Sequence, residues 1–128
     1  MRKSLENLAG RKASGGRRVP SRARRKFELD RYPNEASAGT TITTTRRTRG
    51  NNIKTALKAA ETVNVLDPSS KKTTKFAIIR VTKNPANKDY ERRGVISKGA
   101  LVEIEAGTAR VISRPGQDGS INAILMKH

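Results

Sequence analysis

The stretch ALVEIEAGTARVISRPGQDGSINAILM, residues 100–126, decides the fold. Its first residues alternate, with Val102 and Ile104 on one face and Leu101 and two glutamates on the other, as in a half-buried strand. Gly107 permits a turn into a second strand at 108–114. The PGQDG sequence predicts another turn before a last strand at 120–126. This part of the chain therefore predicts short strands joined by turns.

The residues before this stretch continue the strand pattern. Residues 40–48 are rich in threonine, a β-branched residue, and contain no glycine. Residues 53–59 alternate as a half-buried strand does, although apolar side chains within them also fit a helical spacing. A turn at 67–70 precedes a further strand at 73–83.

One short helix is expected among these strands. Asn84 is a good N-cap, and Pro85 suits the first helical position. Residues 86–93 contain no helix breaker, and Gly94 suits the C-cap. Six or seven short strands separated by turn signals indicate a small barrel or sandwich. We therefore predict a mostly β fold, a small six- to seven-stranded barrel-like domain with one short helix and a basic, extended N-terminal arm.

The first 33 residues have a different composition from the rest. Their block RKASGGRRVPSRARRK, residues 11–26, contains eight cations and no acid. Two alanines and one valine are too little apolar surface to offset the entropy of ordering this block alone. We predict an N-terminal extension, residues 1–33, that is disordered without RNA, and a β-barrel-like RNA-binding body, residues 34–128.

The charge balance points to an anionic partner. The 128 residues include 28 Lys and Arg against 11 Asp and Glu, a net charge of +17. Such an excess repels itself in a compact state unless an anion is bound. There is no cysteine, and the single histidine is the last residue, His128. These counts disfavour thiol, histidine-triad and Cys- or His-ligated metal centres. No apolar run approaches the roughly 18 residues of a membrane span, so we expect a soluble, intracellular protein with no membrane association.

Arginine and lysine are the chemistry that the sequence does offer. The planar guanidinium fork of arginine matches phosphate oxygens, and aromatic residues, only 3% of the chain, are too few for a base-stacking platform. We therefore expect binding to a folded, phosphate-rich RNA surface, with no catalytic residue, metal ligand, cofactor or small-molecule substrate. The candidate RNA-binding residues lie in the basic block, in a cluster between two strands, at the helix end and beside the last turn: Arg11, Lys12, Arg17, Arg18, Arg22, Arg24, Arg25, Lys26, Arg47, Arg49, Asn51, Arg92, Arg93, Lys98 and Arg114.

Four blocks of sequence, in order, carry a resemblance to a known family. They are GTARVISRPGQDGSINAIL at 107–125, NPANKDYERRGVISKGALVE at 84–103, RTRGNNIK at 47–54 and RRKFELDR at 24–31. On these blocks the chain resembles an archaeal member of the archaeal/eukaryotic family of small-subunit ribosomal protein eight, not the bacterial protein of the same number. The resemblance implies a cytoplasmic, structural constituent of the small ribosomal subunit, with ribosomal RNA and neighbouring ribosomal proteins as partners and no enzymatic activity.

Composition alone leaves another function open. A DNA-compacting, chromatin-type basic protein would carry the same charge, because the phosphate contribution to binding is independent of base sequence. An RNA-modifying enzyme is disfavoured by the missing catalytic constellation. The resemblance favours the ribosomal function over both.

Overall fold

The structure is a computed structural model that describes residues 8–23, 25–28 and 32–126. The chain separates into two units, Met1–Pro33 and Asn34–His128. We call the first the arm and the second the body, and each is described by itself.

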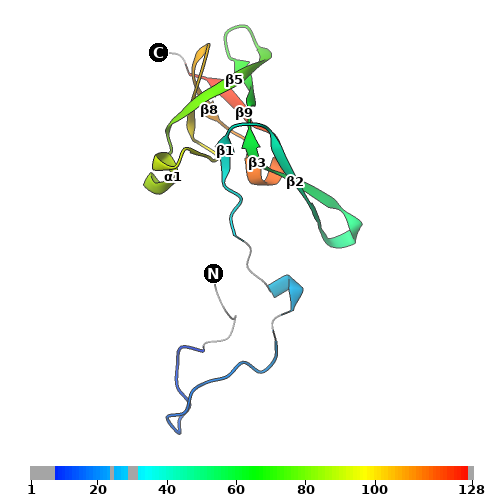
Figure 1. The fold of residues 1–128 in the computed structure, drawn as a ribbon, viewed down its shortest axis with the longest axis vertical. Coiled ribbons are helices and arrows are strands. Elements are labelled where there is room, and N and C mark those ends of the chain that lie inside the picture. Colours follow the sequence, from blue (N-terminus) through cyan, green and yellow to red (C-terminus); the bar gives the residue numbers. More distant parts are fainter. Residues whose placement is uncertain (1–7, 24, 29–31, 127–128) are drawn as a thin grey trace. The chain divides into compact units, whose positions relative to one another are not determined.

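The body is built around a closed β-barrel (Figure 1). Its strands are β4 (Thr62–Asp67), β5 (Lys72–Lys83), β7 (Leu101–Ile104), β8 (Gly107–Val111) and β9 (Asn122–Leu125), joined in the order β4-β5-β7-β8-β9. The consecutive pairs are antiparallel. A parallel pairing between β4 and β9 closes the barrel.

A smaller sheet has the strand order β2-β3-β1-β6. Its strands are β1 (Ala36–Ala38), β2 (Ile42–Arg47), β3 (Ile53–Ala60) and β6 (Val95–Ile96). β2 pairs with β3 from Arg47 opposite Ile53 to Ile42 opposite Ala59. β1 pairs with only the last two residues of β3. The β2–β3 hairpin therefore projects beyond the rest of the sheet, as Figure 1 shows.

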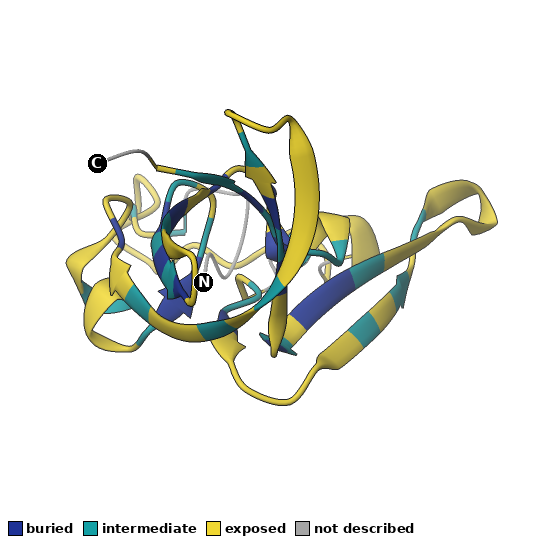
Figure 2. Cartoon of the chain, turned by 90° about the horizontal axis from the view of Figure 1, so that it is seen from above, coloured by how far each residue is buried: buried dark blue, intermediate teal, exposed yellow. Residues whose placement is uncertain are grey.

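The core lies inside the barrel because apolar side chains alternate along its strands. Val102 and Ile104 on β7 are buried, as are Ala109 and Val111 on β8, while the residues between them face outward. Val63 and Val65 continue the core on β4. Figure 2 shows this buried interior and the exposed outer end of the hairpin. The inward faces expected for Val102 and Ile104 are confirmed.

The expectation of a mostly β, barrel-like fold is confirmed, but the strand number was too low. The described residues form nine strands rather than six or seven. The additional strands β1 and β6 are only two or three residues long, too short to produce a periodic pattern. β4 was also missed, although Val63 and Val65 alternate with polar neighbours there. Residues 53–59, where a helical spacing was also present, are strand.

The predicted helix start at Asn84 is wrong. The helix α1 is Lys88–Arg92, and its N-cap is Asn87, whose side chain accepts a hydrogen bond from the Asp89 N–H at 2.9 Å. Asn84 is instead buried, and its Nδ2 donates to the Val95 carbonyl at 2.9 Å. Its Oδ1 accepts hydrogen bonds from the Ala86 N–H at 3.1 Å and from the Ser97 hydroxyl at 3.0 Å. Asn84 therefore closes a turn that precedes the helix and ties the end of β5 to β6.

A second short helix replaces the turn expected at 115–119. The helix α2 is Pro115–Asp118, with proline at its start and Gly119 in the left-handed conformation after its end. The Asp118 carboxylate accepts a hydrogen bond from the Arg114 N–H at 2.8 Å. These features are the usual start and stop signals of a helix, at a spacing of a single turn.

The described part of the arm contains local structure only. Arg11 and Arg17 form an isolated β-bridge around a turn in which the Lys12 N–H donates to the Gly16 carbonyl at 3.0 Å. A single 3-10 turn, η1, follows at Lys26–Glu28. No residue of this described part belongs to the buried core.

Candidate nucleic-acid interface

The β2–β3 hairpin presents a tight, arginine-bearing tip. Its turn, η2, is Arg49–Asn51. Gly50 and Asn51 both have positive φ, at 70° and 61°, which glycine and asparagine tolerate better than other residues. The Thr48 N–H donates to the Asn52 carbonyl at 2.7 Å and closes the turn. The tip therefore holds Arg49 at the outermost point of a defined backbone rather than on a loose loop.

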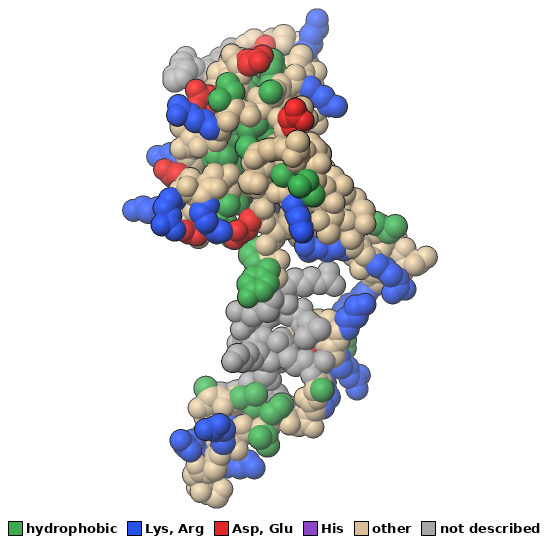
Figure 3. Space-filling view, viewed as in Figure 1, with side chains coloured by type: hydrophobic (Ala, Val, Ile, Leu, Met, Phe, Trp, Pro, Cys, Tyr) green, Lys and Arg blue, Asp and Glu red, His purple; other side chains and the backbone are tan. Residues whose placement is uncertain are grey.

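The charged residues of the hairpin are all cations. The sequence contains no Asp or Glu between Glu35 and Glu61, but it contains five cations there, Arg46, Arg47, Arg49, Lys54 and Lys58. Figure 3 shows blue side chains at the hairpin tip without red ones beside them. Within the described part of the chain, none of these five cations belongs to an ion pair.

Two of these cations face each other across the strands. Arg46 lies directly opposite Lys54 in the β2–β3 register, and Arg47 lies opposite Ile53. Like charges directly opposite each other destabilise an antiparallel pair. The arrangement therefore suits a ribbon whose charge is neutralised by a bound anion. Arg46 belonged to the predicted cluster between the two strands, at 46–52, but Lys54 was absent from the predicted set. The register that pairs them could have been counted out from the tip.

Strand β3 of the hairpin is fixed to the rest of the body. Helix α2 packs against β3, and Lys54 donates from Nζ to Oε1 of Gln117 on that helix at 2.5 Å. The Asn34 side chain donates to the Leu57 carbonyl. Arg114, at the N-cap of α2, is exposed beside this junction. Arg47, Arg49, Asn51 and Arg114 therefore project from one supported substructure.

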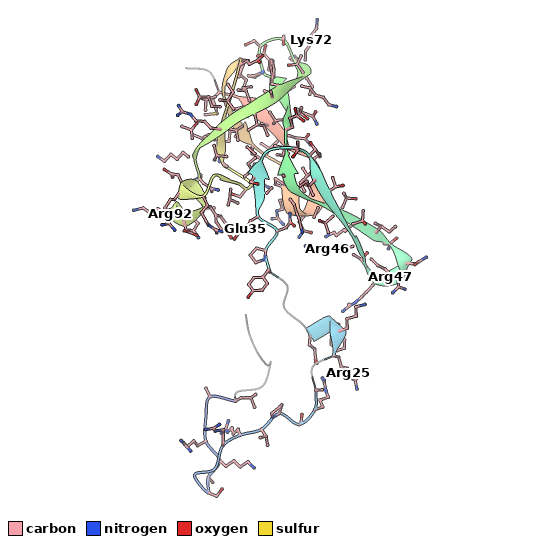
Figure 4. The ribbon with its side chains drawn as sticks, viewed as in Figure 1. Arg25, Glu35, Arg46, Arg47, Lys72 and Arg92 are labelled. Atoms are coloured by element: carbon pink, nitrogen blue, oxygen red, sulfur yellow. The ribbon has the colours of Figure 1, made fainter. Side chains whose placement is uncertain are left out.

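The cations around α1 are used differently. Arg93 donates from Nη1 and Nη2 to the Glu35 carboxylate at 2.5 and 2.9 Å, and its Nε lies 2.9 Å from Asp89 Oδ2. The hydrogen bond to Glu35 raises the pKa of the Arg93 guanidinium above its ordinary value. Arg92 also pairs with Asp89, at 2.9 Å. Figure 4 places Arg92 and Glu35 on the α1 side of the body, away from Arg46 and Arg47 on the hairpin.

These pairs change the interpretation of the predicted helix-end cluster. The sequence grouped Arg92, Arg93 and Lys98 as one set of exposed cations, but two of them have carboxylate partners. Arg93 links α1 to the residue just before β1 and stacks over the Tyr90 ring at 5.5 Å from its centroid. Lys98 lies beyond this network, as the exposed residue of the loop before β7.

Some of the predicted arm residues make hydrogen bonds within the arm, and others are described by their exposure. Arg22 donates from Nη1 to Glu28 at 2.7 Å, so this arginine is partly neutralised within the arm. Arg11 and Arg18 donate to backbone carbonyls of Gly15 and Arg11, at 3.0 and 3.2 Å. Lys12, Arg17, Arg25 and Lys26 have exposed side chains. Arg24 lies outside the described residues.

Other kinds of site find no support in the described residues. They contain no group of three or more His, Cys, Asp or Glu side chains that could hold a metal ion. Among the helices that the structure describes, none has the length and apolar content needed to cross a membrane.

The fold and the surface together define a small, strongly basic β-barrel protein with a cationic hairpin. The family model described as "Ribosomal protein S8e" matches residues 6–126, and the chain belongs to that family. The chain is 47% identical over 118 residues to "Small ribosomal subunit protein eS8" of the archaeon Sulfurisphaera tokodaii. The match covers 91% of this chain and 92% of the relative. The protein of that name from Methanocorpusculum labreanum is 44% identical over 117 residues, covering 91% and 94%. That from Nanoarchaeum equitans is 44% identical over 107 residues, covering 84% of each chain.

The resemblance noted in the sequence is thereby confirmed. The family consists of ribosomal proteins and not of enzymes, in agreement with the expectation of a non-catalytic protein.

Proposed function

We propose that this protein is a structural constituent of the small ribosomal subunit in the cytoplasm, where it binds and stabilises folded ribosomal RNA through arginine and lysine contacts to phosphates. Its relatives are named as small ribosomal subunit proteins, and these names support its place in the small ribosomal subunit. The RNA contacts are inferred from the chain's own charge and geometry.

The cationic hairpin is the observation that carries the proposal. An acid-free ribbon with Arg46 opposite Lys54 is unfavourable alone and becomes favourable beside closely spaced phosphates. A two-stranded ribbon of this kind is narrow enough to lie along an RNA groove, and the wide minor groove of A-form RNA displays phosphates and 2′-hydroxyls to it. Contacts of this type fix the orientation of the protein on one RNA shape.

The arm supplies the second part of the proposal. Its basic block adds eight cations, and each phosphate that they neutralise releases condensed counterions. Because its described part contributes nothing to the buried core, the arm is free to take the conformation that the RNA dictates. We infer that the arm provides affinity with little selectivity, while the hairpin and Arg114 provide orientation.

The test of this function is sedimentation of the full chain from cell extract. Co-migration with small subunits is expected, and ultraviolet crosslinking within that fraction should join the hairpin residues 46–54 to ribosomal RNA. A variant with Arg47→Glu and Arg49→Glu should lose those crosslinks, whereas Lys72→Glu, at another end of the body, should keep them. Migration with the nucleoid instead would favour the DNA-compacting alternative and overturn the proposal.

A further inference from the structure

A pocket lies on the outer side of the barrel wall. It has a volume of about 270 Å³ and lies over β8, β9 and the loop before β7. The residues lining it are Lys98, Gly99, Arg110, Val111, Ile112, Ile124 and Met126. An aliphatic floor and two cations are thus combined in one concave site, and the cationic hairpin forms no part of it.

The apolar residues of the pocket are exposed because of strand alternation. Ala109 and Val111 point into the barrel, so their neighbours Arg110 and Ile112 point outward. Ile112 is 46% exposed and Met126 is 45% exposed. A concave site that combines aliphatic side chains with a few charged groups is suited to contact with another molecule.

Three backbone N–H groups around the pocket are already hydrogen-bonded within the body. The Gly99 N–H donates to the Val111 carbonyl at 2.8 Å, and the Met126 N–H donates to the Thr108 carbonyl at 2.9 Å. The Ile112 N–H donates to the Asn122 carbonyl, also at 2.9 Å. Addition of a β-strand is therefore disfavoured here, and recognition has to come from the side chains.

Among the residues that the structure describes, the two cations at the pocket have no ion-pair partner. In the described part of the chain, neither Lys98 nor Arg110 belongs to an ion pair, whereas Arg80 on the same barrel pairs with Glu103 at 2.5 Å. An unpaired cation beside aliphatic surface is complementary to a carboxylate that adjoins an aliphatic side chain.

We propose that this pocket docks an acidic, aliphatic segment of a neighbouring protein, with a Leu, Ile or Met side chain against Ile112 and Met126 and adjoining carboxylates on Lys98 and Arg110. A nucleobase fits the pocket less well. Its polar edge needs acceptors as well as donors, and the only polar side chains lining the pocket donate. The lining also holds no aromatic ring on which a base could stack. Flexible methionine and aliphatic residues instead suit a protein partner. This proposal rests on the proposed function, because the partner would be another protein of the small ribosomal subunit.

The test uses photo-crosslinking in purified small subunits that have incorporated the full chain. The photoreactive residue p-benzoylphenylalanine replaces Ile112 in one variant and Ile79 in a control, since Ile79 is also an exposed isoleucine and lies on β5 outside the pocket. Crosslinked peptides are sequenced by mass spectrometry. The Ile112 probe should join a protein segment that has Asp or Glu within three residues of a Leu, Ile or Met, and the Ile79 probe should not join that segment. Adding Lys98→Glu and Arg110→Glu should lower the yield at Ile112 by about tenfold, because like charges then face each other.

Three results would overturn the docking proposal. They are a crosslink from Ile112 to ribosomal RNA, a crosslink to a segment without acidic residues, and no crosslink at Ile112 in particles that contain the chain. Absence of the unsubstituted chain from small subunits would instead contradict the proposed function, so the two failures are distinguishable.

Discussion

Glu35 and Arg93 are joined by two parallel hydrogen bonds, at 2.5 and 2.9 Å, across 58 positions of sequence. The pair connects the residue before β1 to the end of α1, and Asp89 holds the same guanidinium from the other side. Figure 4 shows Glu35 near the start of β1 on the side of the body where α1 lies. A two-point contact of this kind fixes orientation as well as distance.

The first prediction concerns the role of this pair. Glu35→Gln and Arg93→Gln should each lower the melting temperature slightly, and Arg93→Gln should lower it more because it also loses the contacts with Asp89 and Tyr90. The double variant should be no less stable than Arg93→Gln, because the contact with Glu35 is already lost there. RNA affinity of Glu35→Gln should be unchanged or raised, since a negative charge is lost. Thermal melts and RNA titration of the three variants check this. Additive losses of stability would show that the two residues act independently.

The second prediction concerns the barrel core. Ile104 and Val111 are 2% and 1% exposed on adjacent strands. Ile104→Ala should cost about 2–4 kcal/mol of unfolding free energy through lost burial and the cavity left behind. Ile79→Ala, at a position 57% exposed, should stay within about 0.5 kcal/mol of the parent. Denaturant titrations measure both, and equal losses would contradict the assignment of faces.

The third prediction concerns the junction between α2 and the hairpin. A Cβ added at Gly119 would lie 3.1 Å from the Thr55 side chain, whereas one at Gly94 would meet nothing within 4 Å. Both glycines have similar positive φ, 70° and 64°, so an alanine at either position carries a similar backbone cost of about 1 kcal/mol. Gly119→Ala should therefore be the more destabilising variant. If Gly94→Ala proved equally destabilising, crowding against Thr55 would be irrelevant.

The fourth prediction concerns pH. Hydrogen bonds from the Ser69 N–H, at 2.9 Å, and the Ser70 hydroxyl, at 2.8 Å, hold the pKa of Asp67 below its ordinary value. Since the pKa is lower in the folded protein, this stabilisation is present above the unfolded pKa of about 3.9 and is lost as pH falls through the folded value. Asp67→Ala should melt below the parent at pH 7, and the gap should narrow at strongly acid pH. A gap that does not depend on pH would contradict this origin.

The strands that could be predicted are those with long periodic patterns. Val102 and Ile104 alternate clearly, and the turn residues around them mark the strand ends. The parallel closure of β4 on β9 could not be predicted, because it depends on packing between segments about 60 residues apart and not on local pattern.

The candidate site shows the same division between local and long-range information. The basic cluster at 46–52 was found from composition, and the flanking strands were correctly expected. The pairing of Arg93 with Glu35 depends on where the chain returns, so charge counting placed Arg93 among the free cations. Asn84 was misjudged for a similar reason, because its partner Val95 lies on a strand too short to recognise from sequence.

The central claim is that the hairpin provides selectivity for one RNA and the arm provides affinity for RNA in general. This claim predicts a different salt dependence of RNA binding for variants of the two parts. Deleting residues 1–33 should flatten the salt dependence of RNA binding. If five phosphate contacts are lost, the slope of log K against log salt concentration should change by about 3 to 4, at about 0.7 for each contact. Reversing a single cation on the body should change that slope by only about 1. The melting temperature of each variant serves as the control for folding.

Competition binding at two salt concentrations, with cognate ribosomal RNA against bulk RNA, tests this claim most directly. Arg49→Glu or Arg114→Glu should reduce the preference for the cognate RNA more than deletion of the arm does. Lys72→Glu, an exposed reversal of equal charge at another end of the body in Figure 4, should leave that preference unchanged. If arm deletion abolishes the preference while the Arg49 and Arg114 reversals keep it intact, the arm carries the recognition and the account is contradicted.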